Sequence, residues 1–430
     1  MAKINHFIIE YTDSINQVGV PTGNGMPPKV VIRRFLRMFR QVDDIRIQAM
    51  IDYPLEEIIL IAFLAVLGNA SNWAEMERFG KQKERWLKKF INLKNGIPSH
   101  DTFRRVFSLI DTKQLQDVTI AFLLKNLHEI KRALNIKDDG YRQICVDGKE
   151  QRGTGRKYQY EDKVRNLQTL HVYDASNALC LYSQPINEKT NEIPVAQDIL
   201  KEMNLKDCIV SFDALHMQKN TVAIIRDQKG HYIGGLKTNQ GNLYEEAFDY
   251  FKEEELLSFY RQKGNYYETI EKAHGQIEKR TFYLVKAMKR KVTKAWKGLK
   301  SFICYVKEVE NLNNNAKKTE IRYYATSLEE VELCAQAIRG HWAVENNLHW
   351  HLDYSLNEDD NTTMDKTAFH NYSLINKMVL SLCKLAKPII GSPSIRTLRK
   401  ELGWGYEECV AMILSSFDAA ALKSSLEIVK

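Results

Sequence analysis

Three acidic residues occupy positions from which they could act together on a phosphodiester bond. Asp147 and Asp213 each end a short apolar run, Ile-Cys-Val-Asp147 and Ile-Val-Ser-Phe-Asp213, and Glu345 lies in a segment with helical spacing. An acid at the end of a buried strand is costly unless it is paired or binds a metal. Two strand-end acids and a third on a helix are what a two-metal phosphoryl-transfer site needs.

Magnesium is the cofactor that such a site predicts. Mg²⁺ prefers oxygen ligands and keeps several waters, so a few carboxylates are enough to hold it. Two ions about 3.5–4 Å apart can activate the nucleophile and stabilise the leaving oxygen. We expect two Mg²⁺ ions here, with Mn²⁺ able to replace them. The spacing by itself does not bring the three acids together, because the chain has 54 acidic residues.

The histidines around Glu345 suggest zinc as an alternative. His341, Glu345 and His349 are spaced i, i+4 and i+8, so a regular helix would present all three on one face. A shared zinc ion would have to span two turns, roughly 12 Å at a rise of 1.5 Å per residue, which disfavours zinc. We expect the histidines to orient Glu345 or to contact phosphate. Trp342 and Trp350 are expected to be core or packing residues rather than platforms on which bases stack.

Composition predicts a soluble, reduced, cytoplasmic protein. The 430 residues are 44% hydrophobic and 27% charged, with a net charge of +8 and seven scattered cysteines without CxxC spacing. The start of the chain lacks the apolar segment of a signal peptide, and the longest apolar run, Ile58 to Leu67, is too short to span a bilayer. There is no P-loop and no dinucleotide fingerprint, so ATP dependence is not predicted.

The hydrophobic periodicity changes along the chain and outlines its organisation. After an irregular lead-in (1–28) and a basic amphipathic segment (29–40), every segment from Pro54 to about Asn135 has a helical pattern. From Gln143 to Leu236 the pattern is β-β-β-α-β-α-β, which predicts a mixed sheet covered by helices. Residues 239–327 break this alternation with a helical piece and three strand-like pieces, and helices resume at Leu328.

Two charged segments carry further expectations. Between Lys279 and Lys300 there are nine Lys or Arg and no acid, which favours a phosphate-binding strip over a merely solvated face. The acids at 358–360 and 365 are expected in a solvated loop. A capped basic helix beginning at Ser99 could belong to a DNA-reading unit, and a plain helical bundle explains it equally well.

Six motifs occur in the order that one protein family shows. They are Val146-Asp-Gly-Lys149 with Arg152-Gly-Thr154, Glu188-Lys-Thr-Asn-Glu-Ile193, Phe212-Asp-Ala-Leu-His-Met-Gln218, Gly235-Leu-Lys-Thr-Asn-Gln240, His274-Gly-Gln-Ile-Glu278 and Arg339-Gly-His-Trp-Ala-Val-Glu-Asn-Asn-Leu-His-Trp-His-Leu-Asp353. From about Pro54 to Leu385 the chain therefore resembles the DDE transposases of bacterial insertion sequences, and most closely the H-repeat-associated family.

The resemblance implies a fold, a reaction and catalytic residues. It implies an α/β fold with an RNase H-like mixed sheet flanked by helices, a β-rich insertion and an all-helical N-terminal domain. The expected divisions are 1–136, helical and DNA-recognising; 137–238, first part of the core; 239–327, the insertion; 328–387, second part of the core; and 388–430, a helical tail. Asp147, Asp213 and Glu345 are implied to be catalytic and to bind metal, in cleavage of element ends and strand transfer into target DNA.

DNA is the expected partner, both as the terminal inverted repeats of the element and as the target. We expect a homodimer to bridge two element ends in the bacterial cytoplasm, at the nucleoid when bound to DNA, without membrane association. The residues expected to contact DNA are Lys149, Arg152, Lys237, Arg280, Arg339, His341, Asn346 and His349. One departure from the family is the run Glu358 to Lys366, where a basic contact is missing or moved to Lys366. This departure leaves open a non-catalytic DNA-binding descendant, and a nuclease without strand transfer is a third alternative.

Overall fold

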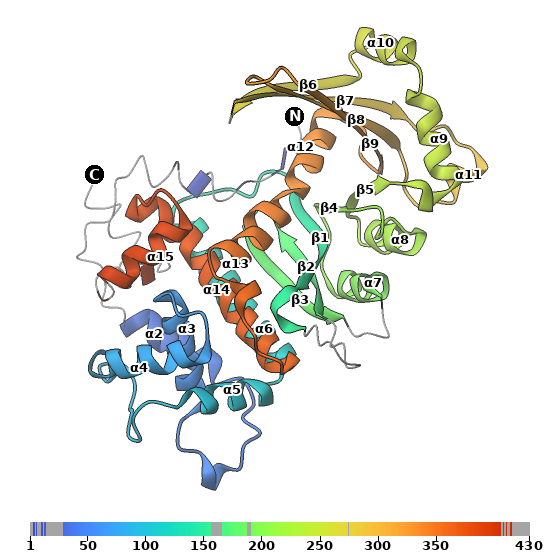
Figure 1. The fold of residues 1–430 in the computed structure, drawn as a ribbon. Coiled ribbons are helices and arrows are strands. Elements are labelled where there is room, and N and C mark those ends of the chain that lie inside the picture. The colour runs from blue at the N-terminus through green and yellow to red at the C-terminus, as the bar shows by residue number, and fades with distance from the viewer. Residues whose placement is uncertain are drawn as a thin grey trace, which may run out of the picture.

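The computed structural model describes residues 3, 4, 6, 10, 11, 13, 29–155, 166–186, 191–273, 275–405, 407, 410, 413 and 414. Most of the expected lead-in and about half of the C-terminal tail lie outside these residues, as do His274 and the first half of the motif that begins at Glu188. Figure 1 shows a helical part at one end, a central sheet crossed by long helices, and an arm of strands at the other end.

The helical part begins with a series of helices separated by short loops. These are α2 (Lys29–Phe39), the short η1 (Gln48–Met50), α3 (Leu55–Leu67), α4 (Trp73–Leu87), α5 (His100–Leu109) and α6 (Thr112–Ala133). Asn72, Ser99 and Asp111 cap α4, α5 and α6, because each side chain accepts a hydrogen bond from a backbone N–H of the first turn. Eleven of the thirteen residues of α3 are buried, so α3 is the centre of this part.

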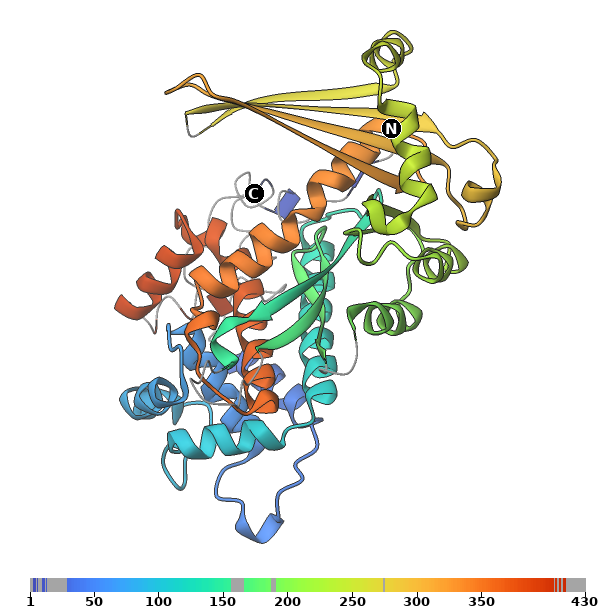
Figure 2. The same ribbon diagram turned by 45° about the vertical axis from the view of Figure 1, so that its right-hand side comes forward.

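The C-terminal helices complete the same core. The long α14 (Lys366–Ile390) packs against α3, α5 and α6, and α15 (Ile395–Trp404) packs against α14. One continuous cluster of buried apolar side chains includes residues from α2 to α15. The helices at the two ends of the sequence therefore fold together, as Figure 2 also shows.

A single mixed sheet of nine strands forms the centre of the molecule. In chain order the strands are β1 (Arg142–Gln151), β2 (Leu167–Asp174), β3 (Leu179–Ile186), β4 (Cys208–Phe212), β5 (His231–Leu236), β6 (Tyr266–Ala273), β7 (Gln276–Lys286), β8 (Ser301–Asn311) and β9 (Lys317–Thr326). Their spatial order is β3-β2-β1-β4-β5-β9-β8-β7-β6. The β1–β4 and β4–β5 pairs are parallel, and all other pairs are antiparallel.

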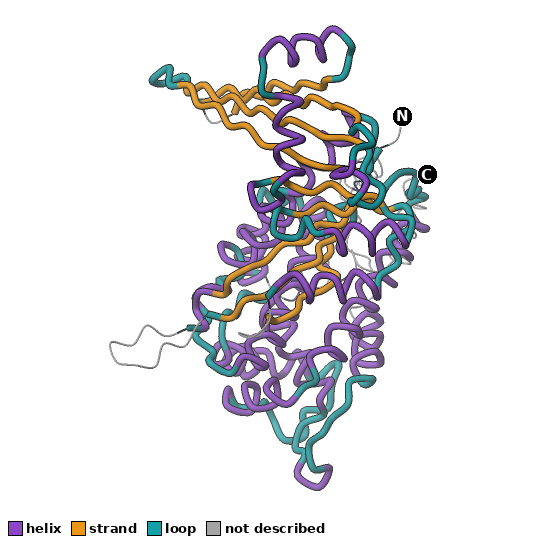
Figure 3. The backbone as a smooth tube through the Cα atoms, turned by 90° about the vertical axis from the view of Figure 1, so that its right-hand side faces the viewer, coloured by secondary structure: helices purple, strands orange, loops and turns teal. Residues whose placement is uncertain are grey.

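The strands of residues 239–327 extend the central sheet rather than forming a separate one. β9 pairs with β5, and β8, β7 and β6 follow outward into the arm seen in Figure 3. The sequence pattern predicted β7, β8 and β9 but missed β6, the edge strand Tyr266–Ala273. Its side chains are mostly charged or half-exposed, as suits a free edge, so it lacks the apolar run that identifies a buried strand.

The remaining elements are α7 (Glu192–Glu202), α8 (Lys219–Asp227), η3 (Thr238–Gln240), α9 (Asn242–Phe251), α10 (Glu254–Gln262), α11 (Lys291–Lys294), α12 (Val331–His341), η4 (Glu345–His349), α13 (Trp350–Tyr354), η5 (Glu358–Asp360) and η2 (Arg152–Thr154). Among them, α12 packs across β1, β4, β6 and β7. None of the described helices is both long enough and apolar enough to cross a membrane. The six cysteines in the described part are free, and five are buried.

Candidate active site

Sheet register brings Asp147 and Asp213 side by side. The parallel pairing of β1 with β4 ends at Val146 opposite Phe212, so each aspartate is the next residue along its strand. The Asp213 carboxylate accepts a hydrogen bond of 2.9 Å from the backbone N–H of Leu215, which holds it at the start of the following turn. The carboxyl ends of parallel strands meet at one edge of a sheet, and ligands bind at such an edge.

Helix α12 brings Glu345 to the same edge through a close contact with β1. Gly340 lies directly on the amide of Gln143, and a Cβ at Gly340 would overlap Oε1 of that amide. Gln143 is fully buried and donates from Nε2 to the backbone oxygen of Ala337 at 2.7 Å and to Ser211 Oγ at 3.2 Å. Glycine is therefore needed for α12 to approach the sheet, and this contact fixes the start of the segment that carries Glu345.

The predicted helix over Arg339–Asp353 is present, but a π turn at Glu345–His349 interrupts its regular α geometry. Such wider turns often occur at functional sites. As a result, His341 and Glu345 line one cavity, whereas His349 lies against β2. The single face that the i, i+4, i+8 spacing predicted does not form, which further disfavours a zinc site built from these three residues.

All three acids line one cavity of about 640 Å³. Asp147 is partly buried with 22% of its side chain exposed, and Asp213 and Glu345 are exposed. Burial, followed by repulsion from Glu345 and Asp213, raises the pKa of Asp147 from 3.8 to about 7. Burial is the main cause of the rise, and the part due to Glu345 and Asp213 is repulsion that a bound cation would relieve.

The donor chemistry fits divalent cations that prefer oxygen, because the cavity collects carboxylates on a strand edge and on a helix. Within the described part of the chain, however, no group of three or more His, Cys, Asp or Glu is drawn together as a finished ligand set. The two findings are compatible, since the exposed Glu345 side chain would complete the set by turning toward an ion, and the backbone N–H of Leu215 already holds the Asp213 carboxylate at the cavity. We therefore regard the cavity as a candidate metal site whose ligands would close on binding.

Two histidines lie next to the strand ends that carry the aspartates. His349 Nε2 lies 2.8 Å from His171 Nδ1, and His349 Nδ1 lies 3.7 Å from Asp147 Oδ2. Burial, with the charges of Lys149 and Lys377, lowers the pKa of His349 to about 3, so its approach to Asp147 is not an ion pair at neutral pH. On the other side, His341 Nδ1 lies 3.2 Å from Ser211 Oγ, directly before the residues that lead to Asp213.

These contacts change two roles expected from the sequence. His349 lies beside Asp147 rather than Glu345 and is half-buried, so it is poorly placed to reach DNA phosphate. Burial lowers the pKa of His341 to about 4, so the His341 side chain in the cavity is neutral rather than cationic at neutral pH. His349 lies beside Asp147 and His341 beside Ser211, two residues before Asp213, and neither histidine carries positive charge at neutral pH.

Comparisons with known proteins identify the family. The model for the transposase DDE domain matches residues 138–382, and the model for the domain associated with it matches residues 36–123. This chain belongs to the DDE transposases. The protein named "Putative transposase YncI" of Escherichia coli O157:H7 is 32% identical over 379 residues, covering 86% of this chain and 92% of that protein.

A second relative, named "H repeat-associated putative transposase YhhI", comes from Escherichia coli strain K12. It is 31% identical over 337 residues, covering 76% of this chain and 84% of that protein. The resemblance to the H-repeat-associated family is thereby confirmed. A cryo-EM structure of a piggyBac transposase synaptic complex with hairpin DNA matches with a TM-score of 0.38 at 10% identity, over 94% of this chain and 86% of that one. That match is distant in both sequence and structure.

Lys149 is not available to DNA in this transposase. Only 6% of its side chain is exposed, and Nζ lies 2.6 Å from Asp353 Oδ1 and 3.6 Å from Asp359 Oδ1. The ion pairs tie β1 to α13 and η5, so a phosphate contact would have to break them. The structure therefore argues against the expected DNA contact and gives Lys149 a structural role behind the cavity.

The acids expected in a solvated loop differ in exposure: Asp360 and Asp365 are exposed as predicted, Asp359 is partly buried, and the prediction was wrong for Glu358. Glu358 is fully buried and accepts a hydrogen bond of 2.5 Å from Ser373 Oγ, and the buried Lys377 also donates to Ser373 Oγ. Asp359 accepts from the backbone N–H of Arg152 at 3.3 Å. Buried charges persist where they are paired, and the partners here come from β1 and α14, far away in sequence. Asp365 caps α14.

The other expected DNA contacts differ in how accessible they are. Arg152, Lys237 and Asn346 are exposed, and Lys237 lines the cavity with the three acids. Arg280 and Arg339 both pair with Glu271, and Arg280 also pairs with Glu278. The two arginines therefore join β6 and β7 to α12, which leaves Lys237 as the expected cationic contact that lines the cavity.

The basic segment 279–300 is largely neutralised by acids from elsewhere in the chain. Six of its nine cations lie within 4.0 Å of a carboxylate; these are Lys279, Arg280, Lys286, Arg290, Lys297 and Lys300. Three exposed lysines, which we call the unpaired lysines, make no ion pair among the described residues: Lys289, Lys291 and Lys294. The segment therefore has less free positive charge than its sequence, which contains no acid, predicted.

The tryptophans near the site are more exposed than expected. Trp342 is 38% exposed and lines the cavity, and the guanidinium of Arg322 lies over its ring, 5.0 Å from the ring centre. Trp350 is 50% exposed and stacks on Tyr354 at 4.5 Å. Neither tryptophan is in the core, but both pack against neighbouring side chains, Trp342 against Arg322 and Trp350 against Tyr354.

Two residues near the aspartates were missed by the sequence reasoning. Glu192, the first residue of α7, places its carboxylate beside Gly148, and the buried His216 lies 3.4 Å from that carboxylate. Repulsion from Glu192 is also a minor contribution to the raised pKa of Asp147, after burial and the charges of Glu345 and Asp213. Glu192 lies in one of the six motifs, but nothing local indicated that it reaches the site.

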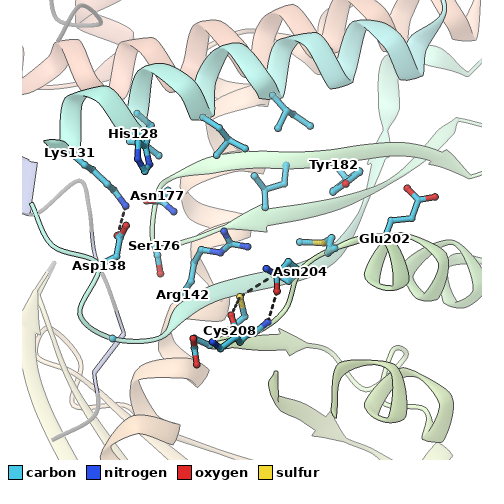
Figure 4. Close-up of a pocket in the computed structure, with 18 residues that line it drawn as sticks. His128, Lys131, Asp138, Arg142, Ser176, Asn177, Tyr182, Glu202, Asn204 and Cys208 are labelled. Carbon is cyan, nitrogen blue, oxygen red and sulfur yellow. Dashed lines mark hydrogen bonds and ion pairs between the residues drawn. The ribbon is translucent and has the colours of Figure 1, made fainter. Parts of the chain in front are cut away.

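A second cavity of similar size lies away from the three acids. It has a volume of about 610 Å³ and is lined by residues that include His128, Lys131, Arg142 and Glu202 (Figure 4). Arg142 and Cys208 begin β1 and β4, so this cavity is at the strand ends opposite to Asp147 and Asp213. Lys131 pairs with Asp138 at 2.5 Å within it. Its charges are mixed in sign, and it shares no lining residue with the candidate site.

Proposed function

We propose that this chain is an insertion-sequence transposase that cleaves DNA at element ends and joins the freed ends to target DNA. Asp147, Asp213 and Glu345 are its catalytic residues. They would hold two Mg²⁺ ions, which Mn²⁺ can replace. The observation that carries the proposal is that these three acids line one cavity in a chain that belongs to the DDE transposases.

The reaction exchanges phosphodiester bonds. Water attacks phosphorus at the element end, the bond from phosphorus to the 3′ oxygen breaks, and a 3′-hydroxyl is freed. That hydroxyl then attacks a phosphodiester of the target, so one phosphodiester replaces another and no high-energy cofactor is needed. When bound, the divalent ions would activate the attacking oxygen and stabilise the leaving one.

Residues of the chain would prepare this chemistry by position and charge. The register of β1 and β4 sets the separation of the two aspartates. The contact of Gly340 with Gln143 sets the distance between α12, which leads to Glu345, and strand β1. The neutral pair His349 and His171 supports Asp147 without adding positive charge that would compete with a cation. Lys237, exposed at the cavity, is placed to contact a DNA phosphate.

The finer fold assignment belongs to the same proposal. We infer that β1–β5, with the order β3-β2-β1-β4-β5 and their covering helices, form an RNase H-like core, and that residues 239–327 are an insertion that lengthens its sheet. The division into regions 1–136, 137–238, 239–327, 328–387 and 388–430 follows from that inference. Synapsis of two element ends would use a homodimer on DNA.

The test compares variants on labelled DNA that carries the element ends, with a plasmid target and Mg²⁺ or Mn²⁺. Asp213→Asn and Glu345→Gln should abolish nicking and joining while retaining binding to end DNA. Glu320→Gln is the matched control, because Glu320 lines the same cavity but pairs with Arg322 and is not a proposed ligand. Joined products from Asp213→Asn would remove Asp213 from the catalytic set.

The same assay separates the two alternatives. A non-catalytic descendant would bind end DNA without nicking it under any divalent metal, and the altered run from Asn361 to Lys366 is the feature that favours it. A nuclease without strand transfer would yield cleaved ends but no joined products. Either result with the unaltered chain would refute the transposase proposal in its full form.

A further inference from the structure

Glu192 lies against strand β1 at Gly148, the residue that follows Asp147. It begins α7 directly after the capping residue Asn191. A Cβ at Gly148 would lie 2.6 Å from Glu192 Oε1 and 2.7 Å from Oε2, so the carboxylate rests on the backbone of the residue that follows Asp147. The glycine leaves the space that the carboxylate fills.

His216 connects the same carboxylate to the loop of Asp213. Its Nε2 atom lies 3.4 Å from Glu192 Oε2, and its backbone N–H donates to Asp213 Oδ1 at 3.4 Å. The side chain is only 2% exposed, and neither ring nitrogen makes a hydrogen bond with well-formed geometry among the described residues. Glu192 therefore contacts Gly148 and His216, which lie in the segments that follow the two catalytic aspartates.

A structural explanation accounts for part of this arrangement. An acid in the first turn of a helix is favoured by the positive end of the helix dipole. That preference does not explain why the carboxylate turns onto Gly148 or why a buried imidazole faces it without full hydrogen bonding. Buried polar groups in proteins are nearly always satisfied, so an incompletely bonded imidazole that faces Glu192 next to the loop of Asp213 points to a bound polar ligand.

We propose that Glu192 is a fourth carboxylate of the divalent-cation site, held in place by His216, and that it strengthens binding of the ion shared by Asp147 and Asp213. This inference rests on the proposed function, because it assumes that the cavity binds Mg²⁺ or Mn²⁺. Mg²⁺ retains several waters, so Glu192 would act on the ion through a water as readily as by direct contact.

The experiment measures Mn²⁺ binding to the full chain without DNA by calorimetry. Glu192→Gln should weaken Mn²⁺ binding by about 10–100-fold, the reduction typical of changes to residues that support metal ligands. Gly148→Ala should weaken it as well, because the added methyl group displaces the Glu192 carboxylate. Glu202→Gln is the matched control, since Glu202 ends the same helix far from the site, and it should bind Mn²⁺ like the unaltered chain.

Thermal unfolding with EDTA and with Mn²⁺ distinguishes metal binding from a purely structural role. Loss of a helix-end interaction alone would lower both midpoints equally. A role at the metal predicts that Glu192→Gln chiefly reduces the stabilisation that Mn²⁺ adds, because a ligand stabilises the state that binds it. Glu192→Asp keeps the charge and should recover part of the affinity, which keeps the test decisive if Glu192→Gln does not fold.

The outcomes separate this inference from the proposed function. Unaltered Mn²⁺ affinity in both Glu192→Gln and Gly148→Ala, with normal binding by the unaltered chain, would overturn only the role of Glu192. Failure of the unaltered chain to bind Mn²⁺ at all would overturn the metal site itself and the inference with it. Weak binding in Glu192→Gln with normal binding in Glu202→Gln would support both.

Discussion

Replacing Gly340 by alanine tests whether α12 is held against β1 as closely as the structure indicates. The added methyl group would overlap Gln143 Oε1 and lie 2.8 Å from its Cδ and 3.0 Å from its Nε2. Gln143 cannot move aside freely, because it is fully buried and bonded to Ala337 and Ser211. Either the amide loses these bonds or α12 moves away from the sheet.

The expected change in the free energy of unfolding combines opposite effects. Alanine in place of glycine within a helix stabilises by about 1 kcal/mol. Overpacking a filled interior costs about 1–3 kcal/mol. Breaking a hydrogen bond of the buried amide costs about 1–3 kcal/mol more, if its partner is left unsatisfied. The net expectation for Gly340→Ala is a destabilisation of about 1–5 kcal/mol.

Gly403→Ala supplies the matched control. Gly403 also lies within a helix, α15, but a Cβ there meets no atom within 4 Å. This substitution should therefore raise stability by about 1 kcal/mol, since only the helix preference acts. Thermal midpoints of the two variants, measured side by side, should shift in opposite directions from that of the unaltered chain.

The catalytic assay extends the same prediction to the site. Movement of α12 would displace Glu345, and a misplacement of about 1 Å can cost about 100-fold in rate. We expect Gly340→Ala to slow strand joining by that order, and Gly403→Ala to leave it unchanged. If Gly340→Ala were stabilised like the control and joined DNA normally, the close approach to Gln143 could not be what positions the helix.

Three further predictions concern charges in and behind the site. The pKa of Asp147 is raised from 3.8 to about 7, so the metal-free protein should lose stability as pH rises from about 4 to 7, by at most about 4 kcal/mol. Denaturation measured over this pH range with EDTA should show the loss, and Asp147→Asn should remove it. The sign follows because the folded chain retains a proton that the unfolded chain releases. Lys149→Met should lower stability, by less than the roughly 3–5 kcal/mol of a fully buried pair because its acidic partners are partly exposed, and a normal thermal midpoint would argue against that pair. Replacing the unpaired lysines together by alanine should reduce the slope of DNA affinity against salt concentration by about 0.9 for each phosphate that is no longer neutralised, and an unchanged slope would place DNA elsewhere.

Much of the secondary structure follows from local patterns in the sequence. The apolar runs that end at Asp147 and Asp213 identified β1 and β4, and alternation of strands and helices identified the mixed sheet. The motif beginning at Arg339 predicted the helix of Glu345, although the π turn within it has no local signal. The edge strand β6 was missed because a charged, half-exposed strand lacks the apolar pattern of a buried one.

The surroundings of charged residues were predicted less well. Lys149 and Glu358 look like surface residues in sequence, and both are buried with partners that are remote along the chain. Likewise, the basic segment 279–300 contains no acid, yet most of its cations meet carboxylates from other elements. A charge pattern read along one segment cannot include the counter-charges that folding brings to it.

Residue type and order were enough to indicate which side chains could do chemistry, because the acids at strand ends and the family motifs are properties of the chain itself. The arrangement of those side chains emerged from the folded molecule: Asp147 and Asp213 are in register, Gly340 admits α12 to the sheet, and Glu192 contacts Gly148 and His216, which follow the two aspartates. The physical reason is that periodicity reflects the burial of one element at a time. Register, close approach and charge pairing depend on contacts between residues far apart in the chain.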